Sequence, residues 1–142
     1  MIEEIKDKGS IIAIIVRSNY KKDGISFFTP NSFSQQLAFM AHPAENTISP
    51  HVHNPVSREV CLTQEVLFIK KGKLRVDFYD NEKIYLESRI LSEGDVILLA
   101  AGGHGFEVLE DVEMFEVKQG PYTGDKDKTR FKKVKSSNLI IR

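Results

Sequence analysis

The sequence predicts an all-β protein, an antiparallel sandwich or barrel of about ten short strands. First, none of its 142 residues belongs to a segment with the periodicity of a long helix. Second, β-prone runs are separated by turn residues at about every eighth to twelfth position. Third, residues 73–79 alternate strictly, which places Leu74, Val76 and Phe78 on one face of a strand.

Each expected element has a local justification. The first nine residues are polar and end in Gly9, so they predict a helical turn or a frayed end. Lys71-Gly72 predicts a tight turn, and the wholly apolar run 96–99 predicts a strand buried on both faces. Other strands are predicted from β-branched, apolar or alternating runs: 10–17, 25–28, 36–42, 47–53, 58–70, 73–79, 84–91, 106–109 and 112–118.

Length and charge restrict the organisation and the partners. A chain of this size predicts a single domain, 1–142, with a barrel core over about 10–118 and a polar tail over 119–142. Twenty basic and twenty acidic residues give a formal net charge of zero. Because nucleic-acid binders normally carry a basic excess, we expect no nucleic-acid partner.

Cysteine content and hydropathy indicate the compartment. Cys61 is the only cysteine, which excludes an internal disulfide, fits a reducing cytosol and favours a buried, inert thiol. The apolar run 11–16 is six residues long and follows an acidic start, so it predicts a buried strand rather than a signal peptide or membrane span. We therefore expect a cytoplasmic protein without a membrane partner.

The most informative stretch is Pro50-His51-Val52-His53. If this stretch is extended, His51 and His53 point to the same side, because side chains alternate along a strand. Two imidazoles on one face can hold a divalent metal or handle a proton. Glu65 and His104, arriving from other strands, would complete a first-row metal site.

These residues resemble the first motif of the cupins, which is Gly, five residues, His-x-His, three or four residues, Glu, six residues, Gly. His51-Val52-His53 matches the His pair, and Glu65 is separated from Gly72 by the required six residues. Glu45 stands where the motif has its first Gly, and eleven residues separate His53 from Glu65. The longer spacing leaves open whether Glu65 or Glu59 faces the site.

A second cupin motif is Gly, five residues, Pro-x-Gly, two residues, His, three residues, Asn. Gly94 opens the matching stretch, Ala100 replaces the Pro, and Gly102 keeps the Gly. His104 arrives one residue early, and Val108 stands where the Asn would be. The resemblance covers roughly residues 45–118 and implies the double-stranded β-helix of the cupins, a jelly-roll barrel.

The resemblance implies a metal centre inside the barrel, formed by His51, His53, Glu65 and His104. Three imidazoles and a carboxylate suit Fe, Mn, Ni, Cu or Zn. Such a centre would make the protein an oxygenase or isomerase acting on a small polar molecule.

Two other functions remain open. A metal-free isomerase or epimerase would act on a sugar nucleotide, with His51 and His53 as acid and base and Tyr122 or Tyr79 as partner. Candidates to clamp its phosphate are three arginines, Arg58, Arg75 and Arg130. The third possibility is a binding module for a metal or sugar without turnover.

The tail and the apolar ends suggest contacts beyond the barrel. Residues 119–131 are favoured as a solvated, charged loop, with folding over the barrel mouth as the alternative. The basic side chains within 126–135 could meet phosphate, although Asp125 and Asp127 dilute their field. The resemblance also implies a homodimer, for which runs 11–16 and 139–141 are the expected contacts.

Overall fold

β-strands dominate the regular structure of this computed structural model, which describes residues 1–142. The strands and the two 3-10 turns are β1 (Ile2–Asp7), β2 (Ser10–Val16), β3 (Gly24–Phe27), β4 (Ala38–Ala41), β5 (Glu65–Tyr79), β6 (Tyr85–Ser92), β7 (Val96–Leu99), β8 (Gly103–Lys118), η1 (Gly124–Asp127) and η2 (Ser136–Asn138). The chain divides into two compact units, residues 1–20 with 62–142 and residues 21–61.

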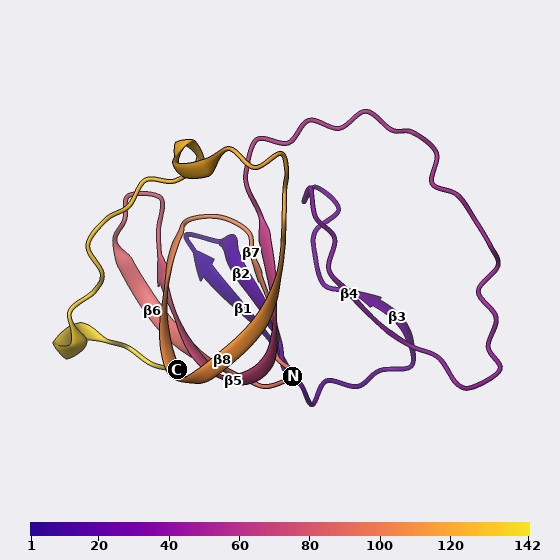
Figure 1. Ribbon diagram of the computed structural model, residues 1–142, viewed down its shortest axis with the longest axis horizontal. Helices are drawn as coiled ribbons and strands as arrows, with labels where there is room; N and C mark the ends of the chain where they lie inside the picture. Colours follow the sequence, from indigo (N-terminus) through magenta and orange to yellow (C-terminus); the bar gives the residue numbers. More distant parts are fainter. The chain divides into compact units, whose positions relative to one another are not determined.

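The first unit is a single six-stranded antiparallel sheet. Its strands follow the order β1-β2-β7-β5-β6, and β8 pairs with β5. The sheet curls into a half-barrel, seen in Figure 1 as the U formed by β5 and β8. The prediction of an all-β, antiparallel architecture is therefore confirmed at this level.

β5 and β8 form a long bent ribbon, where the sequence predicts several short strands. They contain 15 and 16 residues and are paired from Glu65 opposite Lys118 to Tyr79 opposite Gly103. The expected turn at Lys71-Gly72 is wrong, because β5 continues through it with shifts in register. Gly72 has a φ of 84°, and a Cβ there would collide with the carbonyl oxygen of Asp111. The glycine thus bends a continuous strand instead of ending it.

The core lies on the concave face of this sheet. Leu74, Val76 and Phe78 are fully buried, as their alternation predicts. β7 is buried on both faces, which is also as predicted. Other buried core residues are Ile5, Ile12, Ala13, Ile15, Leu67, Ile69, Leu91, Ile97 and Leu99.

The N-terminus is a strand, so the expected helical turn or frayed end is wrong. Ile5 is fully buried, and its neighbours pair with β2 through most of β1. Glu3 accepts hydrogen bonds from Arg17 at 2.6 Å and from Arg89 at 3.0 Å. Since β1 and β6 end the strand path β1-β2-β7-β5-β6, the Glu3–Arg89 pair links its two ends through side chains.

The second unit contains only one short hairpin, formed by β3 and β4. The strand predicted over 47–53 does not form, and only residues 65–70 of the strand predicted over 58–70 are extended, as the start of β5. Pro50 and Pro55 lack the backbone donor that a central strand needs, and no strand of the chain pairs with residues 46–64. The apolar residues here are exposed instead of buried.

The C-terminal residues pair with the free edge of β6. Ile141 forms a parallel bridge with Ser88, whose backbone N–H donates to the carbonyl of Ile140 at 2.8 Å. Residues 139–141 thus add a single bridge to the edge of β6. No helix in the structure has the length and apolar character needed to cross a membrane.

Candidate functional site

Glu65 and His104 meet on the concave face of the half-barrel. Nε2 of His104 lies 3.2 Å from Oε2 of Glu65. His104 is paired with Phe78, and directly opposed residues in antiparallel strands share a face. Glu65 shares its face with Leu67, two residues further along β5. Both functional side chains therefore point to the side that holds the core.

The bend of β5 makes this meeting possible. Glu65 starts β5, whereas His104 lies opposite Phe78, thirteen residues further along the strand. A straight strand of that length would separate the two positions by about 40 Å. The curl around Gly72 brings the two ends of the β5–β8 ribbon together, so the site depends on the bend.

The charge of Glu65 follows from its neighbours. This carboxyl is 6% exposed. The hydrogen bond from His104 lowers the pKa of Glu65, burial opposes this effect, and the charges of Lys118 and Lys128 lower the pKa further. Glu65 is therefore ionised at neutral pH and can orient the imidazole beside it.

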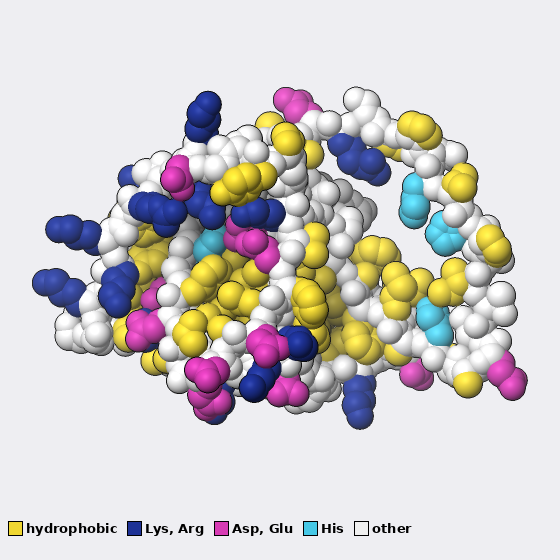
Figure 2. All heavy atoms as spheres, in the orientation of Figure 1, with side chains coloured by type: hydrophobic (Ala, Val, Ile, Leu, Met, Phe, Trp, Pro, Cys, Tyr) yellow, Lys and Arg dark blue, Asp and Glu magenta, His cyan; other side chains and the backbone are white.

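The pair lies in an open cleft of about 580 Å³. Figure 2 shows a histidine and acidic side chains below a row of Lys and Arg, with hydrophobic side chains beneath them. The cleft is lined by Thr63, Glu65, Tyr79, Gly102, Gly103, His104, Gly105, Phe106, Glu116, Asp127, Lys128, Thr129, Arg130, Phe131 and Lys133. It combines cations, a carboxylate–imidazole pair and aromatic walls, which suits a small polar ligand.

One wall of the cleft is the tail, so residues 127–133 approach the site although most of their side chains stay exposed. The ring of Phe131 packs edge-on against Tyr79, with centroids 5.0 Å apart. The backbone N–H of Val134 donates to the hydroxyl of Tyr79 at 3.0 Å, and Thr63 donates to Asp127 at 2.9 Å. These contacts fix this part of the tail along one side of the cleft.

His51 and His53 lie in the second unit, in the irregular stretch after β4. Both are exposed, and their ring centroids are 5.4 Å apart. Nδ1 of His51 is 2.9 Å from the carbonyl oxygen of Ser49. The four expected ligands thus occur as two pairs, one in each unit. No group of three or more His, Cys, Asp or Glu side chains is arranged to hold a metal ion.

The other expected residues have different surroundings. Tyr122 is 83% exposed, and Nζ of Lys118 lies 5.9 Å from its ring centroid. Glu59 and Arg58 are exposed in the second unit. The expectation of a buried Cys61 is wrong, since the thiol is exposed where the predicted strand does not form.

The three expected phosphate clamps also differ from one another. Arg75 is buried and donates to Asp77 at 2.8 Å and to Glu107 at 2.8 Å, outside the cleft lining. Arg130 belongs to the cleft wall and forms an ion pair with Asp125 at 3.2 Å. Of these two arginines, Arg130 is therefore the one placed to meet a ligand in the cleft.

Lys118 is a site residue that sequence reasoning missed. Its Nζ lies 3.8 Å from Oε1 of Glu65, because the two residues are paired across β5 and β8. In the sequence it is only the last residue of a β-prone run. The register of the two strands, which no local signal reveals, makes it a neighbour of Glu65.

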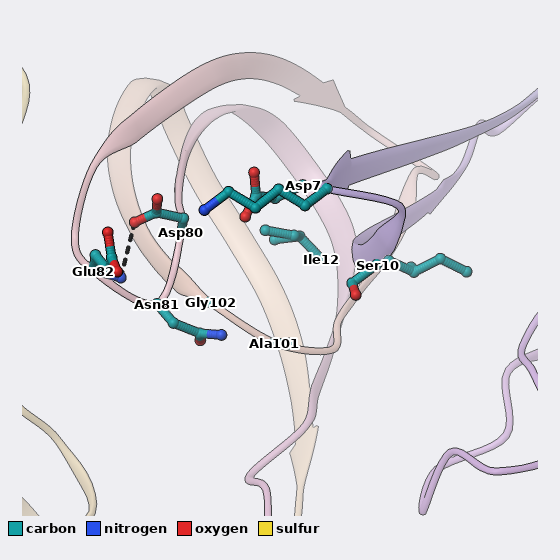
Figure 3. A pocket seen from close by; sticks show the side chains of 10 residues that line it. Asp7, Ser10, Ile12, Asp80, Asn81, Glu82, Ala101 and Gly102 are labelled. Carbon is teal, nitrogen blue, oxygen red and sulfur yellow. Dashed lines mark hydrogen bonds between the residues drawn. The ribbon is translucent and has the colours of Figure 1, made fainter.

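A second, smaller cavity of about 310 Å³ lies beside the turn between β5 and β6. Figure 3 shows Asp7, Asp80 and Glu82 around it. Oδ1 of Asp80 accepts hydrogen bonds from the backbone N–H groups of Glu82 and Ile84, both at 2.8 Å. Asp80 thus has a structural role in its turn.

No family model, curated protein or solved structure matches the chain. The resemblance to the cupins therefore depends on the two sequence motifs. The functional argument depends on the cleft and on the residues that line it.

Proposed function

We propose that the protein is a cupin-type, jelly-roll enzyme whose cleft binds a small polar molecule with an anionic group. In this proposal the Glu65–His104 pair moves a proton on the bound molecule. The observation that carries it is the 3.2 Å contact between Nε2 of His104 and the buried carboxylate of Glu65, within a cleft that also contains cations. A carboxylate that orients an imidazole is the arrangement that general-base catalysis needs.

The roles follow from the donor and acceptor chemistry. When Nε2–H of a neutral His104 donates to Glu65, Nδ1 is the acceptor and can take a proton from the substrate. The ionised Glu65 then stabilises the imidazolium that forms. Positive charge for a phosphate or carboxylate group of the ligand comes from three cleft residues, Lys128, Arg130 and Lys133.

This chemistry corresponds to an isomerase or epimerase, for which a sugar nucleotide is the proposed substrate class. The catalytic base is His104, whereas the sequence favoured His51 and His53. Tyr79, which lines the cleft, replaces the exposed Tyr122 as the proposed aromatic partner. The hydroxyl of Tyr79 accepts a bond from Val134 and retains its own proton to donate.

Proton exchange with solvent tests this function directly. We expect the protein in D2O to introduce deuterium next to the carbonyl of a keto-sugar nucleotide within a substrate panel, as followed by NMR. His104→Ala should lower the exchange rate by about 10²- to 10⁴-fold, since it removes the base. Lys22→Ala, in the second unit, is the control. Exchange at an unchanged rate in His104→Ala would contradict the assignment.

A second candidate is a metal-dependent oxygenase or isomerase. Glu65 and His104 are ligand types that Fe, Mn, Ni, Cu and Zn accept, and His51 and His53 are the remaining predicted ligands. Glu65 and His104 meet in the cleft, so the first unit supplies two of the four predicted metal ligands. Elemental analysis of protein purified without added metal tests this candidate. About one metal ion per chain, lost in both His104→Ala and His51→Ala, is the expected result.

A further inference from the structure

The outer edge of β8 is unpaired. β8 hydrogen-bonds only to β5, so its other edge carries free backbone groups along as many as 16 residues. Apolar side chains on this strand are also exposed, between 39% and 62% of each. They are Phe106, Val108, Leu109, Met114, Phe115 and Val117. A long apolar edge of this kind is a template for another strand.

A second segment of the chain also has exposed apolar side chains and lacks a strand partner. We call residues 48–62 the exposed arm, because every residue in it is exposed and none belongs to a strand. Its large apolar side chains all occupy even positions, so an extended arm would show them on one face. These residues are Ile48, Val52, Val56, Val60 and Leu62, between 48% and 85% exposed.

The rest of the second unit cannot stabilise the arm alone. β3 and β4 form an isolated hairpin of four-residue strands, and Ile25, Phe27 and Met40 are more than half exposed. A two-stranded hairpin is marginally stable in water at best. The second unit therefore needs a surface outside itself.

We propose that the exposed arm of one chain adds antiparallel to the β8 edge of a second copy, and that the exchange is reciprocal. Pro55 is compatible with this pairing in the register that turns the backbone groups of odd-numbered residues to the outer edge. Pro50 would face β8, so it marks the start of the paired stretch.

The short covalent connection favours a second copy over the same pairing within one chain. An arm antiparallel to β8 runs parallel to β5, because β5 and β8 are antiparallel. Parallel strands of one sheet need a crossover of about a dozen residues or more. Only Thr63 and Gln64 separate the arm from β5. The backbone N–H of Gln64 also donates a hydrogen bond to the side-chain oxygen of Gln119. A second copy has no such restriction.

The contact is large enough for a stable dimer. Each chain would contribute its arm and its β8, which together make about thirty residues a side, and a standard interface uses about 20 to 30. The exposed apolar side chains of both segments would leave water together. A reciprocal exchange also removes the free edge from both chains.

The exchange would also place His51 and His53 near another chain's cleft. Antiparallel pairing puts the start of the arm beside the Lys118 end of β8, and Lys118 is 3.8 Å from Glu65. The metal centre of the second candidate would then take one pair of ligands from each chain. This consequence rests on the proposed metal-dependent function, whereas the pairing of the arm does not.

Light scattering after size exclusion tests the exchange in solution. We expect twice the 16.1 kDa chain mass at micromolar concentration. Val56→Asp places a charge on the apolar face and should raise the dimer dissociation constant at least about tenfold. Ser57→Asp, the neighbouring change on the other face, should leave it nearly unchanged. A monomeric wild-type protein, or equal effects of the two variants, would overturn the proposal.

Cys61 offers a test of orientation, because it is the only cysteine and lies near the end of the arm. Under mild oxidation, antiparallel exchange predicts disulfide-linked dimers when Val108→Cys places a second cysteine in the first half of β8. Val117→Cys, at the other end, and Ile84→Cys, in an exposed turn, should give far less. Loss of the product in Cys61→Ser confirms the partner. A disulfide within one chain, or a preference for Val117→Cys, contradicts the proposal.

Mixed dimers test the shared centre with zinc as the probe. His51→Ala/His53→Ala chains and Glu65→Ala/His104→Ala chains should each lose zinc, and mixing them by refolding should restore binding in the heterodimer. If the wild type binds zinc but the mixture does not, the centre belongs to one chain and the shared-site consequence is wrong. If the wild type binds no zinc, the metal-dependent candidate fails, and the disulfide test still decides the arm exchange.

Discussion

Two pairs of candidate residues are held in different ways. Glu65 and His104 are 39 residues apart in the sequence, yet strand register and a bend bring them to 3.2 Å. His51 and His53 are almost adjacent in the sequence, and a contact between His51 and the Ser49 carbonyl is their local support. The comparison shows that proximity along the chain does not position a site. Pairing between strands positions it.

The region that holds the first pair depends on a buried polar network on the outer side of β5. Asp77 accepts two hydrogen bonds from Arg75, at 2.8 and 3.1 Å, and one from Ser88 at 2.6 Å. Arg75 is 7% exposed and Asp77 3%. The strand segment opposite Gly105 and Glu107 is thereby fixed beside the cleft. The exposed arm contains no comparable network.

The largest effect should come from breaking this network. Asp77→Ala leaves the Arg75 charge buried without its main partner and should lower the free energy of unfolding by about 3–5 kcal/mol. Urea denaturation at pH 7 measures the loss. Arg58→Ala removes an exposed arginine of the arm and should change stability by less than about 0.5 kcal/mol. Similar losses in both variants would remove the distinction between the two regions.

The second effect concerns the bend itself. Gly72→Ala introduces a Cβ against the Asp111 carbonyl at a φ of 84°, so it should cost about 2–4 kcal/mol. It should also weaken ligand binding in the cleft, because the bend brings Glu65 to His104. Gly9→Ala is the matched control, since Gly9 has a φ of 85° but open space around it. Its cost should be limited to about 1–2 kcal/mol of backbone strain. Equal costs for the two changes would show that the close approach is unimportant.

The sequence predicted the core better than the connections. The alternation of Leu74, Val76 and Phe78 specifies one buried face, and the structure confirms it. Lys71-Gly72 has the composition of a tight turn, but a positive φ serves a bulge equally well, and only the partner strand distinguishes them. The N-terminal strand was missed because Ile2 and Ile5 alone give a weak pattern among charges.

The sequence predicted the candidate site only in part, because local sequence signals do not specify which strands pair or in which register. Glu65 and His104 were found because each has a recognisable sequence surrounding. Lys118 was missed because its role depends on the register between β5 and β8. The strand expected around His51 failed because Pro50 and Pro55 restrict pairing, and strand propensity contains no information about a partner.

A smaller effect should appear in the pH dependence. The pKa of Glu65 is lowered in the folded state, so its contribution to stability is present above the unfolded pKa of about 4.3 and is lost as the pH falls through the lower folded value. Glu65→Gln removes this contribution. We expect the stability difference between wild type and Glu65→Gln to be largest near pH 7 and to shrink below about pH 4.

Glu3 needs separate treatment in that experiment. Burial opposes its ionisation, but hydrogen bonds and charges from Arg17 and Arg89 outweigh burial and lower its pKa. Its contribution is therefore lost in the same acidic direction, and it is present in both proteins. The difference between wild type and Glu65→Gln cancels it. A difference that grows on acidification would mean that Glu65 does not carry the lowered pKa.

The smallest effect should come from the histidines of the arm. His53→Ala removes an exposed side chain on the face opposite the apolar row, so it should change the free energy of unfolding by less than about 0.5 kcal/mol. Dimerisation should also be unaffected, because the apolar face of the arm is intact. His104→Ala is the informative comparison, since it removes the closest partner of the Glu65 carboxylate, which is buried in the wild type, and leaves only Lys118 beside it. Urea denaturation of both variants should show a clear loss only for His104→Ala. A loss of more than about 1 kcal/mol in His53→Ala, independent of protein concentration, would mean that the arm is anchored within its own chain.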